Sequence, residues 1–150
     1  MAIAVGSAGL TTLGIAVAQD KTTPPGFENM LTTTLEGVEG KELIISRVEL
    51  APNTELPPHW HPGEEIGYVL EGDMILEQKG QGGVIVRAGQ IIKIPYKQIH
   101  SGASRDDGAK LLVIRVHDKG EPERVPVDRS EMEAQPEEAA EAPAEEEAAD

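Results

Sequence analysis

The chain has 150 residues, enough for one domain with a sizeable core but too few for two of ordinary size. Its net charge is −14, and it has no cluster of Lys and Arg with which to bind a nucleic acid or an anionic membrane surface. The absence of cysteine excludes disulfides, thiolate metal sites and a cysteine nucleophile. Aromatic residues make up only 3% of the chain, so the core must be aliphatic, and a core of Val, Ile and Leu favours strands.

The N-terminal segment has the features of an export signal. Residues 1–19 are uncharged and mostly apolar, and Ala16-Val17-Ala18 has the small-x-small pattern of a cleavage site. We predict a signal peptide over residues 1–18, cleaved after Ala18, and a periplasmic or secreted protein with no stable membrane association after signal removal. Because no basic residue precedes the apolar stretch, three alternatives stay open: a start upstream of the first residue, an uncleaved anchor and a buried N-terminal segment.

Residues 19–130 are predicted to form a single domain built from short strands. Runs of β-type residues follow one another through the middle of the chain, and no amphipathic helical repeat interrupts them. Gly72-Asp73 is interpreted as a tight hairpin turn, and residues 80–83 and 88–90 as further turns. Many short strands with Gly turns indicate an all-β sandwich or barrel. The predicted strands cover residues 31–35, 43–50, 66–70, 74–77, 83–87, 91–95 and 110–117, together with the segment around His59.

Three histidines and one glutamate form the candidate metal site. Side chains alternate between the two faces of a strand, so His59 and His61 point the same way while Trp60 points the opposite way. Glu65 follows shortly after, and closure of a barrel would bring His100 to the same place. Imidazole and carboxylate groups are ligands of divalent first-row metals, so we predict that all four side chains bind one ion.

Other polar and aromatic residues near the ligands have less specific interpretations. Glu64 is expected to face solvent. His117 is expected at the surface, on the same face as Arg115, because strand ends usually emerge into solvent. Trp60, which points away from the ligands, is expected to pack in the core or at a dimer interface.

The C-terminal segment, residues 131–150, is predicted to be a disordered acidic tail. It holds nine acidic residues and no basic one, which leaves 18 acidic against 13 basic residues, a net charge of −5, for the rest of the chain. A segment of Glu, Ala and Pro cannot bury enough apolar surface to offset the entropy of ordering. The simplest interpretation is a solubilising tail, and the alternative is a segment that binds a cation or a basic partner.

The residues between the two end segments resemble the cupin superfamily. Its first motif is Gly, five residues, His-x-His, three or four residues, Glu, six residues, Gly. The chain has His59, His61, Glu65 and Gly72 in this register, with Asn53 in place of the leading Gly. Asn is the non-Gly residue that best tolerates a positive φ, so the turn at this position can be retained.

The second cupin motif is Gly, five residues, Pro-x-Gly, two residues, His, three residues, Asn. The chain has Gly89, Pro95 and His100 in register, with Lys97 in the position of the second Gly and Ser104 in that of the Asn. The metal-binding residue of this motif is thus kept. The resemblance extends over about residues 33–116 and is close to small single-domain bacterial cupins.

The resemblance implies a jelly-roll barrel of the double-stranded β-helix type, a divalent transition metal and homodimerisation. Iron, manganese, nickel, copper and zinc all accept these ligands, so the pattern does not distinguish them. The leading hypothesis is a metal-binding cupin that acts on a small molecule as a dioxygenase-like oxidoreductase. The alternative is a non-catalytic cupin that binds a metal or small ligand, for example as a sensor, because this fold supports many functions.

Overall fold

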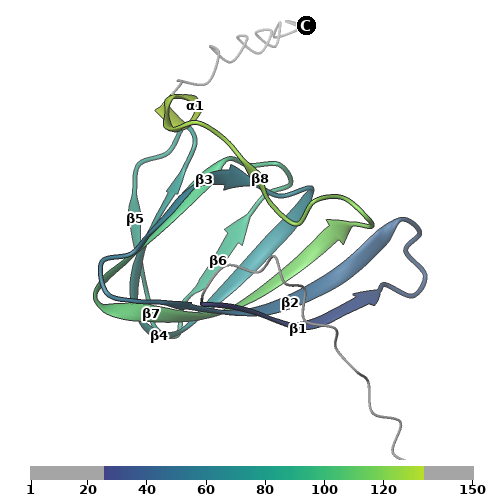
Figure 1. The fold of residues 1–150 in the computed structure, drawn as a ribbon, viewed down its shortest axis with the longest axis horizontal. Coiled ribbons are helices and arrows are strands. Elements are labelled where there is room, and N and C mark those ends of the chain that lie inside the picture. Colours follow the sequence, from purple (N-terminus) through teal and green to yellow (C-terminus); the bar gives the residue numbers. More distant parts are fainter. Residues whose placement is uncertain (1–25, 134–150) are drawn as a thin grey trace, which may run out of the picture.

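The computed structural model describes residues 26–133. The predicted signal peptide and residues 134–150 of the predicted acidic tail lie outside the described residues. Eight strands wrap around one interior, with a short helix beyond one end (Figure 1). The elements are β1 (Phe27–Thr34), β2 (Lys41–Leu50), β3 (Glu55–Trp60), β4 (Gly63–Gln78), β5 (Val84–Arg87), β6 (Ile91–Ile94), β7 (His100–Asp118), β8 (Val125–Pro126) and α1 (Arg129–Glu133).

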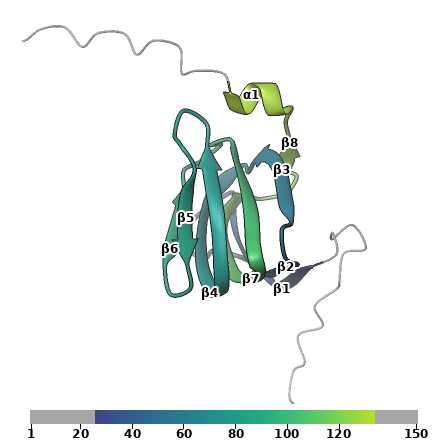
Figure 2. The same ribbon diagram turned by 90° about the vertical axis from the view of Figure 1, so that its left-hand side faces the viewer.

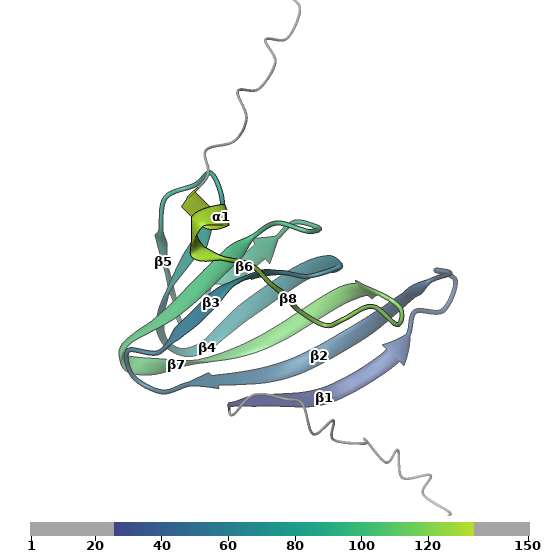
Figure 3. The same cartoon turned by 45° about the horizontal axis from the view of Figure 1, so that its top comes forward.

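All strand pairs are antiparallel, and the two long strands β4 and β7 belong to both layers of the barrel. The C-terminal half of β7 pairs with β2, and its N-terminal half pairs with β3. β4 pairs with β7 along its length and carries β6 and then β5 on its other edge. The turned views place β5 and β6 on one side of β4, and β8 beside β3 (Figures 2 and 3). The predicted all-β jelly-roll barrel is therefore confirmed.

Two glycines let the long strands turn the corner between the layers together. Gly72 in β4 and Gly108 in β7 both have a φ of 73°. A Cβ added to Gly72 would lie 2.1 Å from the carbonyl oxygen of Gly108, so neither the backbone conformation nor the space suits a side chain. The predicted hairpin at Gly72-Asp73 is wrong: the chain bends there but continues along the same neighbour, β7, on both sides of the bend.

The structure extends several elements beyond their predicted limits. β7 begins at His100, ten residues before the predicted strand over 110–117. The residues that precede 110 have low β propensity, so the sequence did not indicate a strand. They form one because they pair with β3 and β4. Strand β8 and helix α1 were not expected. α1 includes the first residues of the predicted tail, and its Met132 is only 8% exposed. No helix within residues 26–133 has the length and apolarity needed to cross a membrane.

The aliphatic core fills the interior beside the corner glycines. The core forms because alternate side chains of the long strands point into the barrel: in β4, buried and exposed residues alternate without exception from 63 to 70. Phe27 and Leu56 pack against this core. Its buried members are Val48, Leu50, Val69, Met74, Leu76, Val86, Ile92, Ile94, Ala109, Leu111 and Val113.

Candidate metal centre

The fold brings together three of the four predicted ligands in the barrel interior. His59 is the penultimate residue of β3, His61 follows that strand, and His100 begins β7 opposite His59. One ring nitrogen from each of the three histidines lies within 4.8 Å of the others. All three side chains are buried, with exposed fractions of 4%, 2% and 4%. Residues far apart in sequence thus form a compact imidazole cluster.

Each imidazole is oriented by a main-chain carbonyl oxygen. Nδ1 of His59 lies 2.7 Å from the carbonyl oxygen of Pro57, and Nδ1 of His100 lies 2.9 Å from that of Gln98. Nδ1 of His61 lies 2.5 Å from the carbonyl oxygen of Glu123. A carbonyl oxygen can only accept a hydrogen bond, so each Nδ1 carries a hydrogen, and in a neutral imidazole of this tautomer Nε2 is the atom with the lone pair. Metal-binding histidines are commonly held in this way.

The free ring nitrogens fit a metal ion. Nε2 of His61 is buried and lies 3.0 Å from Oε2 of Glu65, and no other group within residues 26–133 is bonded to it. Burial lowers the pKa of His59 to about 3, and burial also lowers the pKa of His100. Both rings are therefore neutral at pH 7, which is the state that binds a metal.

Glu65, the fourth predicted ligand, faces the cluster from β4 but is also held by an arginine. Its Oε1 lies 4.0 Å from Nε2 of His100, and its Oε2 accepts a 2.7 Å hydrogen bond from Nε of Arg115. Burial alone would raise the pKa of Glu65, but the neighbouring Arg115 guanidinium holds it well below its ordinary value. The carboxylate is therefore ionised at neutral pH.

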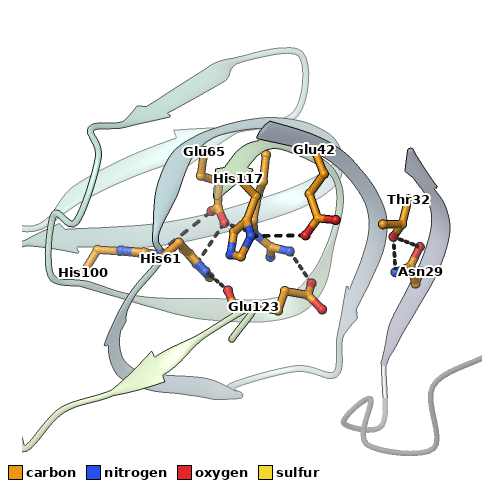
Figure 4. Close-up of polar contacts among 9 residues, drawn as sticks. Asn29, Thr32, Glu42, His61, Glu65, His100, His117 and Glu123 are labelled. Carbon is orange, nitrogen blue, oxygen red and sulfur yellow. Dashed lines mark hydrogen bonds and ion pairs between the residues drawn. The ribbon is translucent and has the colours of Figure 1, made fainter. Parts of the chain in front are cut away.

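A second glutamate, on the connection between β7 and β8, ties this network together. The carboxylate of Glu123 accepts a 2.5 Å hydrogen bond from Arg115, while its main-chain carbonyl accepts the hydrogen of His61 Nδ1. Figure 4 shows Glu123 near His61 and Glu65; the side chain of Glu123 is 49% exposed, whereas His61 and Glu65 are buried. One residue thus contacts both a histidine of the cluster and the arginine that holds Glu65.

The prediction that His117 and Arg115 lie at the surface is wrong. His117 is 0% exposed and Arg115 is 4% exposed. The reason is that the end of β7 has neighbours on both sides, since His117 pairs with Glu42 of β2 and with Gly63 of β4. Nδ1 of His117 lies 3.5 Å from Oε1 of Glu42 (Figure 4).

The residues that depart from the cupin motifs keep the backbone geometry of those motifs. Asn53 has a φ of 54°, as predicted, and Lys97, in a Gly position, has a φ of 56°. Ser104, in the Asn position, donates a hydrogen bond to the carbonyl of Ala51 at 2.6 Å and accepts one from the main-chain nitrogen of Thr54 at 3.0 Å. Ser104 therefore closes the turn that contains Asn53.

Two neighbours of the ligands lie outside the cluster. Glu64 is exposed, as expected, and its carboxylate lies 3.5 Å from Lys93 Nζ. Trp60 is half-buried rather than part of the core, and Lys97 Nζ lies 5.4 Å from the centre of its ring.

Together, the jelly-roll topology and the imidazole cluster define a class of β-barrel proteins whose interior fits a transition metal. Comparison of the sequence with family models agrees: residues 46–116 match the family described as "Cupin domain". The protein belongs to the cupin superfamily.

Relatives of known activity match only parts of the chain. A stretch of 67 residues is 43% identical to human 3-hydroxyanthranilate 3,4-dioxygenase, covering 43% of this chain but only 23% of the enzyme. The chain therefore spans less than a quarter of that relative.

Among solved structures, DMSP lyase DddQ from Ruegeria pomeroyi has a TM-score of 0.52 at 24% identity, covering 59% of this chain and 44% of the lyase. A deletion mutant of Bacillus subtilis oxalate decarboxylase OxdC has a TM-score of 0.53 at 15% identity, covering 72% of this chain and 33% of the decarboxylase. These structures are similar to this protein in fold.

Proposed function

We propose that the protein binds a divalent transition metal through His59, His61, His100 and Glu65, and that it oxidises a small organic molecule with O₂ in a dioxygenase-like reaction. The observation that carries the proposal is the set of three buried imidazoles, each with Nδ1 bonded to a carbonyl and Nε2 directed away from that bond. The partial similarity to 3-hydroxyanthranilate 3,4-dioxygenase supports the class of reaction.

The protein's own groups have separable roles in this proposal. A bound metal ion would supply open coordination positions and redox chemistry for O₂ and substrate. The main-chain carbonyls orient the three imidazoles. Arg115 keeps Glu65 ionised and occupies its Oε2, which leaves Oε1 as the oxygen for the ion. The buried interior limits the access of water to the reacting groups.

The first test is metal content. The His59→Ala, His61→Ala double variant is expected to lose the metal, with a larger effect than the roughly 10- to 100-fold loss of affinity caused by removing an outer partner. Elemental analysis of protein from its native compartment identifies the ion. The His117→Ala variant removes a buried imidazole outside the cluster and serves as the control. Unchanged metal content in the double variant would refute the site.

The second test is turnover. Oxygen consumption is measured for the metal-loaded protein with a panel of enediols, flavonols and small acids. The Glu65→Gln variant is expected to lose turnover, and the exposed neighbour provides the matched control, Glu64→Gln. Absence of oxygen consumption with any first-row metal would reject the dioxygenase-like activity.

A non-catalytic binding or sensory cupin is the second candidate. The observation that favours it is the ionised state of Glu65, which leaves that carboxyl without a proton to donate at neutral pH. Under this alternative, the metal and a small ligand bind with measurable affinity but the ligand is recovered unchanged. Product analysis after prolonged incubation separates the two candidates.

Homodimerisation and export are also proposed. The outer face of the barrel carries Tyr68, Leu70 and Ile91, which are 40%, 45% and 69% exposed, and Tyr68 and Ile91 are paired across β4 and β6. A second copy covering this face would bury them. A monomer in sedimentation at micromolar concentration would contradict the dimer. Mass spectrometry of the exported protein tests cleavage after Ala18.

A further inference from the structure

A small cavity beside the imidazole cluster has one cationic side chain that the proposed metal centre does not use. The cavity has a volume of about 40 Å³, and its walls are mostly aliphatic. His59, His100, Glu65 and Arg115 line it at the polar end, and Arg124 lines it as well. Arg124 comes from the β7–β8 connection, next to Glu123. The inference below rests on the proposed function of this same site.

Arg124 has no carboxylate partner among residues 26–133. The nearby carboxylates of Glu65 and Glu123 both bond to Arg115 instead, at 2.7 Å and 2.5 Å. The guanidinium of Arg124 lies 5.0 Å from the ring centre of Phe27, which covers it without neutralising it. Burial lowers the pKa of Arg124, which reflects the cost of removing the cation from water. A partly desolvated cation of this kind is stabilised when an anion reaches it.

The charges around the cavity favour a negatively charged occupant. Arg115 is bonded to both Glu65 and Glu123, so these two carboxylates and the guanidiniums of Arg115 and Arg124 together carry no net charge. The side chain of Glu123 is 49% exposed and hydrated, whereas the partly buried Arg124 has no carboxylate partner within residues 26–133, and a divalent metal at the histidines would add positive charge to the interior. Charge-assisted hydrogen bonds from a guanidinium to a carboxylate are strong and geometrically specific.

The position of Arg124 also suits a ligand that approaches from outside. Arg124, Phe27 and Leu56 line both the inner cavity and an outer pocket of about 390 Å³. The outer pocket also includes Thr54 and Pro57. A ligand that passes from this outer pocket toward the histidines therefore meets the guanidinium together with apolar side chains.

We propose that Arg124 binds the carboxylate of a small organic acid, and that carboxylic acids with a short apolar body are the ligand class of the outer pocket, which has the room that the inner cavity lacks. The apolar body lies against Phe27 and Leu56, while the carboxylate pairs with the guanidinium. Arg124 is thus a specificity-determining residue, which selects acids over neutral molecules of the same shape.

The test compares butanoate with butanamide, which have similar shapes but differ in charge, by chemical-shift titration of the metal-free full chain. Without a metal, the carboxylate cannot bind to the ion, so the result is independent of metal binding and turnover. The wild type is expected to bind butanoate about tenfold or more tightly than butanamide. Equal affinities would overturn the proposal without any variant.

The variants locate the selectivity. Arg124→Gln is expected to weaken butanoate binding about tenfold and to leave butanamide binding unchanged, whereas Arg124→Lys keeps the charge and part of the preference. Arg87→Gln, at an exposed position on β5, is the matched control. Thermal unfolding confirms that each variant is folded. If Arg124→Gln does not fold, the test rests on Arg124→Lys and on the ratio of butanoate to butanamide affinity in the wild type. Retention of the full butanoate preference in a folded Arg124→Gln variant would overturn the proposal.

Discussion

Along β7, the inward side chains Leu111 and Val113 are followed by Arg115 and His117, so one strand supplies both the apolar and the polar end of the interior. The apolar end is stabilised by burial alone and tolerates changes that conserve volume. The polar end places imidazoles and charges out of water, which is unfavourable unless each group has a partner. The two ends therefore depend on different properties of the sequence: one on side-chain volume and the other on particular pairs of residues.

The largest difference between the ends is expected on removal of the buried arginine. Arg115→Met leaves Glu65 buried without its cation, which should lower the free energy of unfolding by about 3–5 kcal/mol. Urea unfolding measures this change. The control is Arg105→Met, which removes an exposed arginine 3.8 Å from Asp73 and should cost less than about 1 kcal/mol. Equal effects of the two substitutions would show that the polar end does not depend on this pair.

Acidification should destabilise the polar end specifically. The folded-state pKa of His59, about 3, lies below the value of about 6.5 in an unfolded chain. Between these values the unfolded chain binds a proton that the folded protein does not, so stability is flat above pH 6.5 and falls as the pH falls. The slope is about 1.4 kcal/mol per pH unit for one proton.

The corresponding measurement is urea unfolding of the metal-free protein between pH 7 and pH 4.5. Carboxyl groups begin to titrate at the acid end of this range, and comparison with a variant that lacks only the imidazole removes their shared contribution. A His59→Gln variant should show a shallower slope than the wild type. An unfolding free energy that is independent of pH over this range in the wild type would contradict the burial of a neutral imidazole.

At the apolar end, the loss of two buried methyl groups should lower the stability of the fold without changing the metal affinity. Val69 is 0% exposed, so Val69→Ala is expected to lower the free energy of unfolding by about 2 kcal/mol at every pH. Its neighbour on the outer face, Leu70, is 45% exposed, and Leu70→Ala should cost less. Isothermal titration should find the metal affinity of Val69→Ala unchanged, and a weaker affinity would mean that the two ends are not independent.

The smallest effect concerns the link between Glu123 and Arg115. Glu123→Gln removes the carboxylate that holds Arg115 but keeps the main-chain carbonyl that orients His61. The metal affinity is expected to fall by less than the roughly 10-fold that follows the loss of a direct partner of a ligand, because the carboxylate acts on Glu65 only through Arg115. Glu121→Gln, two residues earlier and exposed, is the control, and titration with Zn²⁺ or Co²⁺ compares them.

The sequence predicted the strands and turns of the barrel from local spacing, and it predicted the imidazole cluster from the His-x-His pair together with the resemblance to the second cupin motif, which contains His100. The glycine turns, the alternation of apolar residues and the His-x-His pair are visible without knowledge of tertiary contacts. Asn53 adopted the positive φ expected of it for the same reason. In contrast, Gly72-Asp73 has the residues of a hairpin turn, and only the continued pairing of β4 with β7 distinguishes a corner from a hairpin.

The partners of the ligands were missed for two different reasons. Arg115 and His117 have the same parity as Leu111 and Val113, so the alternation of β7 indicates that they face inward, whereas the tendency of strand ends to emerge into solvent predicts the opposite. Glu123 orients His61 through its main-chain carbonyl, a group that every residue has. No sequence pattern identifies such a contact, because it depends on where the β7–β8 connection lies.

The shared corner of β4 and β7 has a consequence for the order of events in folding. β7 pairs with β2 and β4 through partners far apart in sequence, such as Lys41 with Asp118 and Gly63 with His117, so long loops must close before the barrel exists. His59 and His100 lie opposite each other only when β3 has paired with β7, and Glu65 joins them only when β4 has paired with β7, so the complete site exists only in the closed barrel. A bound metal should therefore slow the opening of the finished barrel and leave its rate of formation nearly unchanged.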